Sequence, residues 1–247
     1  MRLTRIFVPG ALAAGLQIEL PPQAGAHLTR VLRLEPGAPL TLFNGAGGEY
    51  AATLLPANGK HVRARITRHD SIERESPLEV TLLQGIARGE RMDLIVQKAT
   101  ELGVARVVPV LAERSVVKLD AKQRERKRVH WQAIANSACE QCGRNRVPVV
   151  SAPLPFADSL DGLAGDSLRC LLAADGAESL AKVAAQGARQ PLVLLIGPEG
   201  GLADNEQEFA RAHGFVACRL GPRVMRTETA GLAALAVLQA FAGDFGS

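Results

Sequence analysis

The sequence predicts an α/β protein in which a small β-barrel domain precedes a larger domain built on a mostly parallel sheet. Residues 1–70 alternate apolar and polar side chains with the two-residue period of half-buried strands. The rest of the chain alternates short apolar strand patterns with helical patterns, as in sheets covered by helices. Residues 70–77 are polar and separate the two rhythms. We therefore expect domains at 1–72 and 73–247.

The front domain contains three strand patterns and one short helical pattern. Residues 39–43 and 49–55 predict a hairpin pair around a Gly-rich turn. Residues 61–68 alternate apolar with mostly basic side chains, so one face of this strand should be buried and the other exposed. The helical pattern covers residues 27–34.

The second domain begins with a strand pattern followed by an amphipathic helix. Apolar positions from Met92 to Leu102 fall on one helical face, and Gly103 supplies the stop. A last helix at 227–241 is apolar nearly all round, which predicts burial in a core or an interface. The strand patterns of this domain are residues 78–84, 106–110, 168–173, 191–196 and 215–220.

Two segments near the end of the chain carry most of its chemical information. Residues 194–201 and 220–230 each begin as an apolar strand that ends abruptly in Gly-Pro and continues into a helical pattern. Glycine allows the backbone to come close to a ligand, and Glu199, Arg226 and Glu228 lie beside these turns, so the pair predicts a cofactor pocket. Neither segment is a G-x-G-x-x-G or a P-loop motif. A simpler interpretation of the second segment is a helix N-cap, Thr227, with flanking surface charges.

Charge is unevenly distributed along the chain. Residues 1–68 contain 8 basic and 3 acidic side chains, whereas residues 151–247 contain 7 basic and 11 acidic ones. This asymmetry suggests a polyanion bound by the first part and a small-molecule site in the last, although solvated faces that differ in charge would explain it equally well. The basic run at 124–128, ahead of Trp131, has the same two interpretations. Aromatic residues make up 4% of the chain, which argues against a base-stacking platform.

The cysteines and the N-terminus indicate where the protein works. The 4 cysteines do not form a disulfide framework, and the single C-x-x-C at 139–142 has no second pair at zinc spacing. The N-terminus lacks the apolar segment of a secretory signal, and the longest apolar stretch is too short to cross a bilayer. We expect a cytoplasmic protein that uses neither a metal nor a membrane.

With these residues in view, the chain resembles the bacterial methyltransferases that make N3-methyluridine in 16S ribosomal RNA, the RsmE-type members of the SPOUT superfamily. The resemblance runs along nearly the whole chain and rests on segments in the same order. Cys142, where Ser is more usual, and the unremarkable segment 173–176 are departures from the family pattern. The segments are residues 31–33, 43–50, 97–103, 113–117, 131, 140–144, 197–202 and 220–230.

The resemblance implies a PUA-like β-barrel in front and a SPOUT α/β domain whose C-terminal segment is threaded through a deep trefoil knot, a rare connection. It also implies a homodimer with the knots at or near the interface. S-adenosylmethionine would lie bent among three loops at 172–176, 197–202 and 220–226. The residues implied to bind this cofactor are Leu172, Gly197, Pro198, Glu199, Gly200, Gly201, Leu220, Gly221, Val224, Met225 and Thr229.

The implied reaction is methylation at N3 of a specific uridine in small-subunit ribosomal RNA, with the assembled 30S subunit as the expected substrate. The imide proton must leave and the methyl group must be attacked in line, so the protein mainly positions the reactants. Arg226 is the candidate stabiliser of the imide anion, and Glu199 or Glu228 would take the proton or orient Arg226. The expected RNA contacts are Arg30, Arg33, Lys98, Arg114 and Arg144.

Two other functions stay open. A different SPOUT methyltransferase, acting on a ribose 2′-oxygen or another base, would share the fold, although residues 225–230 differ from the Ser-Leu-Asn motif of the 2′-O class. A non-catalytic RNA-binding or assembly factor would share it too, but the intact Gly-rich loops with Glu199 and Arg226 favour cofactor binding. A cofactor titration separates these two alternatives.

Overall fold

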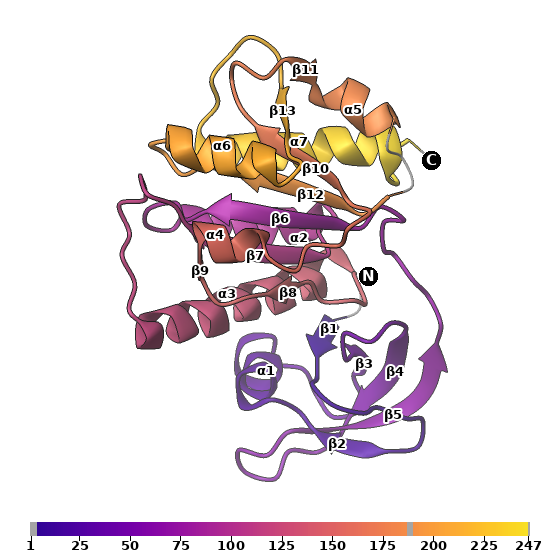
Figure 1. The fold of residues 1–247 in the computed structure, drawn as a ribbon. Coiled ribbons are helices and arrows are strands. Elements are labelled where there is room, and N and C mark those ends of the chain that lie inside the picture. Colours follow the sequence, from indigo (N-terminus) through magenta and orange to yellow (C-terminus); the bar gives the residue numbers. More distant parts are fainter. Residues whose placement is uncertain (1–3, 187–189, 247) are drawn as a thin grey trace. The chain divides into compact units, whose positions relative to one another are not determined.

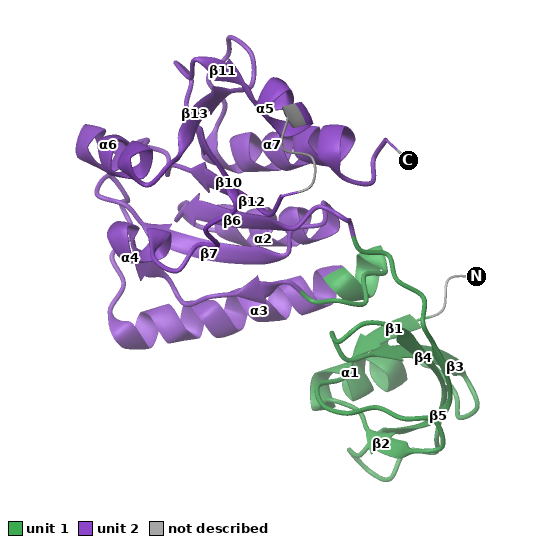
Figure 2. Ribbon diagram, turned by 45° about the vertical axis from the view of Figure 1, so that its right-hand side comes forward, with its two compact units in different colours: residues 1–75, 139–147 green, residues 76–138, 148–247 purple. Residues whose placement is uncertain are grey.

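The computed structural model describes residues 4–186 and 190–246, which form two compact units (Figure 2). Unit 1 is the described chain up to Glu75 together with Cys139–Val147. Unit 2 is Ser76–Ala138 together with the described chain from Pro148 onward. The chain thus returns to unit 1 at Cys139–Val147, which the single boundary expected after residue 72 does not include. The end of a long helix and the loop after it belong to unit 1, because their polar groups bond to the front of the chain.

Unit 1 is built on a five-stranded sheet in the order β1-β3-β4-β5-β2 (Figure 1). β1 pairs with β3 in parallel, and the other pairs are antiparallel, including the predicted β3–β4 hairpin. A short helix, α1 (Pro22–Ala26), leads into the π-helix η1 (His27–Val31), so helical structure begins before the predicted residue 27. The strands are β1 (Thr4–Phe7), β2 (Gln17–Glu19), β3 (Pro39–Phe43), β4 (Glu49–Leu54) and β5 (Arg63–Asp70).

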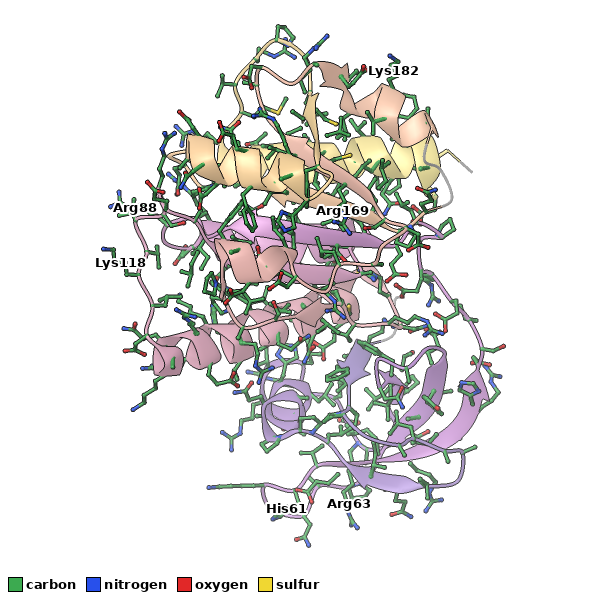
Figure 3. The ribbon with its side chains drawn as sticks, in the orientation of Figure 1. His61, Arg63, Arg88, Lys118, Arg169 and Lys182 are labelled. Atoms are coloured by element: carbon green, nitrogen blue, oxygen red, sulfur yellow. The ribbon has the colours of Figure 1, made fainter. Side chains whose placement is uncertain are left out.

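The alternation in β5 has the expected result. Ala64 and Ile66 are buried in the core of unit 1, whereas Arg63 and Arg65 are exposed. Figure 3 labels Arg63, whose side chain extends away from the sheet. A period of two residues places successive side chains on opposite faces of a strand, so a single pattern explains both the core and the basic outer face.

In the described part of unit 2, eight strands form one sheet in which every neighbouring pair is parallel. The order is β11-β13-β10-β12-β6-β7-β8, and β9 also pairs with β7. The five predicted strands of this domain are all present. The strands are β6 (Val80–Gly85), β7 (Arg106–Leu111), β8 (Val149–Val150), β9 (Leu154–Pro155), β10 (Leu168–Leu172), β11 (Glu178–Ser179), β12 (Leu192–Ile196) and β13 (Val216–Arg219).

Helices cover both faces of this sheet. On one face α7 packs against α2, α5, β6 and β12, and on the other α4 packs against α6 and β7. The predicted helix at 92–102 and its stop are confirmed, since α2 ends before Gly103, which has φ +83°. The last helix buries one side only, and Phe241 near its end is 55% exposed. The helices are α2 (Arg91–Glu101), α3 (Ala121–Cys142), α4 (Phe156–Leu160), α5 (Leu180–Gln186), α6 (Asp204–Ala212) and α7 (Thr227–Ala242).

Candidate functional site

A cavity of about 770 Å³ opens beside the carboxyl ends of β10, β12 and β13. Its walls are the segments that follow these strands, residues 171–175, 196–202 and 220–228. The carboxyl ends of parallel strands meet at one edge of a sheet, so loops far apart in the sequence converge there. Arg91 and Arg114, from the segments that follow β6 and β7, complete the rim. All of these residues belong to unit 2.

Glycine shapes the walls of this cavity at two places. At Gly85, the last residue of β6, a Cβ atom would lie 2.4 Å from the backbone nitrogen of Pro198, so the strand end and the Gly-Pro turn can touch only without a side chain. Gly221 has φ +80°, a conformation that other residues rarely adopt. The first Gly-Pro turn therefore requires glycine at the β6 residue that it touches, and the second requires glycine for its own backbone conformation.

A chain of hydrogen bonds fixes the two loops to each other. Gln84 Nε2, fully buried, donates to Thr227 Oγ1 at 2.9 Å, and Thr227 Oγ1 donates to the carbonyl oxygen of Gly197 at 2.6 Å. Arg226 holds the N-cap position of α7, so the interpretation of Thr227 as the helix cap is wrong. The Thr227 hydroxyl instead points inward and connects α7 to the Gly-rich turn.

Two carboxylates beside the cavity share one arginine. Glu199 Oε1 accepts hydrogen bonds from the Arg88 backbone N–H and from Arg91 Nη1, both at 2.9 Å. Arg91 Nε lies 3.6 Å from Glu228 Oε1. Burial disfavours ionisation of Glu199, but hydrogen bonds from backbone N–H groups and the Arg91 guanidinium outweigh it and lower the pKa of this carboxyl. Glu199 is therefore a weak proton acceptor.

The structure gathers most of the predicted cofactor residues on this cavity. Thr229 is the exception, because it is exposed on α7 and absent from the cavity wall. Each helical residue is turned by about 100° from the one before it, so Thr229 cannot share the direction of Glu228. The candidate catalytic side chains Arg226, Glu199 and Glu228 do line the cavity. The predicted cofactor residues on its wall are Leu172, Gly197, Pro198, Glu199, Gly200, Gly201, Leu220, Gly221, Val224 and Met225.

The predicted RNA contacts are distributed over both units. Arg30 and Arg33 are exposed in unit 1, and Arg33 has the positive φ of +51° that is uncommon outside glycine. In unit 2, Lys98 forms an ion pair with Glu101 at 2.8 Å. Arg114 lies on the rim of the cavity, where its Nη1 donates to a backbone carbonyl at 3.2 Å.

Arg144 does not suit the predicted role. Its side chain is 8% exposed and pairs with Glu75, whose Oε2 accepts from Arg144 Nε at 2.8 Å and lies 2.7 Å from Nη2. The Arg144 carbonyl oxygen also accepts a bond from Arg5. A buried guanidinium with a carboxylate partner has no face left for a phosphate, so the expectation of a direct RNA contact is corrected to a structural role in unit 1.

The sequence reasoning missed Arg91 and Gln207, which also line the cavity, whereas Asp175 on its wall belongs to the predicted loop 172–176. A signal existed for Arg91, because it follows a predicted strand at the sheet edge where the other loops meet. Figure 3 labels Arg88 and Lys118, whose side chains extend outward from the same side of unit 2, after β6 and β7.

The described residues contain neither a metal-binding group nor a membrane-spanning helix. Across residues 4–186 and 190–246, no three His, Cys, Asp or Glu side chains are grouped so that they could hold a metal ion. No helix in the part of the chain that the structure describes is long and apolar enough to cross a membrane.

Comparison with known proteins gives matches over both units. Residues 74–239 match the RNA methyltransferase domain family, and residues 20–67 match the RNA methyltransferase PUA domain family. The Ribosomal RNA small subunit methyltransferase E of Bacillus subtilis (strain 168) is 34% identical over 219 residues, which are 86% of this chain and 85% of that protein.

Two solved structures are similar over nearly the whole chain. Ribosomal RNA small subunit methyltransferase E from Neisseria gonorrhoeae, bound to S-adenosyl methionine, has a TM-score of 0.91 and 36% identity and covers 99% of this chain and 100% of its own. A protein from Legionella pneumophila, solved with the bound cofactor SAM, has a TM-score of 0.93 and 41% identity with the same coverage. The fold around the cavity is therefore shared with proteins crystallised with this cofactor.

Proposed function

Because the chain belongs to the RNA methyltransferase family of the ribosomal RNA small subunit methyltransferases E, we propose that it transfers a methyl group from S-adenosylmethionine to N3 of a uridine in small-subunit ribosomal RNA. The observation that carries this proposal is the cavity at the carboxyl edge of the unit 2 sheet, where both Gly-Pro loops meet Arg226 and two carboxylates.

The cavity suits S-adenosylmethionine in size, shape and charge. Its volume of about 770 Å³ lies within the usual range for small-molecule sites. At Gly201 and Gly221 nothing lies within 4 Å of where a Cβ would stand, so a side chain there would occupy open space on the cavity wall. Three carboxylates lie on its wall, Asp175, Glu199 and Glu228, together with four arginines. The cavity therefore offers counter-charges both to the cationic groups and to the carboxylate of this cofactor. The cofactor would be held by the three loops, and it supplies an electrophilic methyl group on a sulfonium centre.

The residues of the chain would then position the uridine and manage its charge. Loss of the N3 proton leaves negative charge on the ring, spread over the imide oxygens. Arg226 lines the cavity at the N-cap of α7, and its exposed side chain is free to donate to such an oxygen. Glu199 or Glu228 would take the proton.

The RNA would be held by exposed basic side chains of both units, which are Arg30, Arg33, Lys98 and Arg114. We expect it in the assembled small subunit, in the cytoplasm. The proposed domain arrangement is a PUA-like RNA-binding domain formed by unit 1 and a SPOUT domain formed by unit 2, with a trefoil knot and a homodimer. The exposed apolar side chains near the end of α7, such as Phe241, support an interface there.

The test is incubation of unmodified small ribosomal subunits with the protein and S-adenosylmethionine, followed by nucleoside mass spectrometry of the digested RNA. N3-methyluridine in the product, absent with Arg226→Ala, is the expected result. A ribose-methylated nucleoside would overturn the specificity, and cofactor binding without any methylation would overturn the substrate.

A further inference from the structure

We propose that the two pocket carboxylates have different tasks. Glu228 faces the substrate and accepts its N3 proton, and Arg91 is the positioning residue that holds Glu228 in place, with Glu199 as the anchor of Arg91. This inference rests on the proposed function and assigns the proton acceptor and its support within the same site.

Glu199 is already occupied by partners from the protein. One of its oxygens accepts two hydrogen bonds, from the Arg88 backbone N–H and from Arg91 Nη1, at 2.9 Å each. A carboxylate satisfied in this way is stabilised in its charged form and holds its donors in fixed positions. Its role is therefore to orient Arg91.

One carboxylate oxygen of Glu228 lacks a hydrogen-bond partner in the described chain. Its side chain is 14% exposed, and among the described residues Oε2 is buried without a hydrogen-bond partner. A buried carboxylate oxygen with no donor is unfavourable, so an incoming N–H group gains a hydrogen bond that the free protein lacks. Glu228 lies in the first turn of α7 and on the cavity wall, where the helix N-terminus favours negative charge. The imide N–H of uridine is a donor of the required kind.

Arg91 connects the two acids through different nitrogens. Nη1 contacts Glu199 at 2.9 Å, and Nε lies 3.6 Å from Glu228 Oε1. The planar guanidinium fixes the angle between these contacts, which a lysine ammonium cannot do. Arg91 begins α2, and the next residue, Met92, is buried, so the base of the side chain is anchored in the core. Oε1 is thus the Glu228 oxygen beside Arg91, and Oε2 is the oxygen left without a partner among the described residues.

Proton loss and methyl transfer take place at the same atom, N3 of the uridine. The N3–H bond breaks and its electron pair stays on N3, while the proton forms an O–H bond on Glu228. The electron pair on N3 forms the new bond to the methyl carbon, and the pair of the broken S–C bond stays on sulfur. The proton then leaves Glu228 for water, because the cavity opens to solvent. Arg226 compensates the transient charge on the ring.

The experiment compares four variants under single-turnover conditions, with saturating S-adenosylmethionine and unmodified small ribosomal subunits, over a range of pH. The variants are Glu228→Gln, Glu199→Gln, Arg91→Lys and Arg91→Met. Glu208→Gln, an exposed carboxylate of α6 outside the cavity wall, is the matched control. Calorimetric titration with the cofactor and thermal unfolding are measured for every variant. The other charged side chains that line the cavity are Arg114, Asp175, Arg223 and Arg226.

Glu228→Gln should lower the rate about 100-fold or more and remove the fall in rate at acid pH, since loss of a general base costs this much. Glu199→Gln should lower the rate by at most about tenfold, and its rate should still fall at acid pH. Arg91→Met should reduce the rate more than Arg91→Lys, which retains the charge. Melting temperature should stay close to that of the control in all variants, and the saturating cofactor keeps any loss of affinity in the Glu199 variant out of the single-turnover rate.

Three results would overturn the inference. In the first, Glu228→Gln turns over at the wild-type rate. In the second, the fall in rate at acid pH disappears in Glu199→Gln and persists in Glu228→Gln. In the third, the melting temperature or the cofactor affinity of Arg91→Met decreases in proportion to its rate, which would give Arg91 a structural role only. If wild-type protein binds the cofactor but makes no N3-methyluridine, the proposed function itself is wrong. If wild-type protein makes N3-methyluridine and one of the three results is seen, only the inference is wrong.

Discussion

Each unit contains a cluster of partly buried acidic and basic side chains, and the two clusters differ in how their members are paired. In unit 1, Glu49 Oε2 accepts from both Arg5 and Arg74, and Arg5 Nη2 also donates to Asn145 Oδ1 at 2.7 Å. Arg5 Nε lacks a partner in the described chain, but both of its terminal nitrogens are bonded. In unit 2, Glu228 lines a cavity, and its Oε2 has no hydrogen-bond partner among the described residues.

This difference separates structural charge from functional charge. Buried ions paired inside the protein tie segments together, and removal of one partner leaves the other uncompensated. A buried carboxylate oxygen without a partner, on a residue that lines a cavity, keeps its capacity to accept a hydrogen bond, and such groups are typical of reactive sites. Substitutions in the unit 1 cluster should therefore affect folding first, and substitutions at the cavity should affect turnover first.

The largest effect is expected from Glu49→Gln in unit 1. Arg5 and Arg74 would lose their common counter-charge, and loss of one member of a buried pair costs about 3 to 5 kcal/mol. Urea unfolding should show a decrease of this size. The matched control is Glu19→Gln, whose carboxylate is 56% exposed in its pair with His61 and should change stability by less than about 1 kcal/mol. Equal effects of the two substitutions would contradict the contrast between buried and exposed pairs.

Arg226→Ala should have the next largest effect, and on turnover alone. Removal of one donor to a developing oxyanion usually lowers kcat by about 100- to 1000-fold, or about 3 kcal/mol. Arg226 is exposed at the N-cap of α7 and forms no side-chain cap hydrogen bond, so the melting temperature should not change. Methyl transfer under saturating substrates is the measurement, with Arg211→Ala on α6 as the control. Full turnover by Arg226→Ala would remove it from the mechanism.

Acid should weaken unit 1 through Glu49, with a smaller effect. Burial raises the pKa of Glu49, but hydrogen bonds and charge from Arg74 and Arg5 outweigh it, so the pKa lies below the ordinary value of 4.5. A depressed pKa means stability that is complete above 4.5 and lost as the pH falls through the folded value. The unfolding free energy of wild type should therefore fall more steeply below pH 4.5 than that of Glu49→Gln. Parallel pH curves would show that Glu49 gives no such linkage.

The sequence predicted the sheet and the cavity loops because these are local properties. Residues 192–196 are an unbroken apolar run, as expected for a strand buried on both faces, and Gly-Pro marks its end. The ion pairs of Arg91 could not be predicted in this way, since Glu199 and Glu228 follow more than 100 residues later and spacing does not encode such contacts. The prediction that Arg144 contacts RNA has a related weakness, because only the fold places Arg144 beside Glu75.

The smallest effect is expected from the comparison of Arg30 with Arg144 in RNA binding. Arg30 is exposed, so Arg30→Ala should remove about one phosphate contact and reduce the slope of log affinity against log salt by about one, without loss of stability. Arg144→Ala should leave this slope unchanged and lower the melting temperature, because it frees the buried Glu75 from its partner. Titration of small-subunit RNA at several salt concentrations measures both. A reduced slope with Arg144→Ala and unchanged stability would place Arg144 at the RNA after all and make its ion pair incidental.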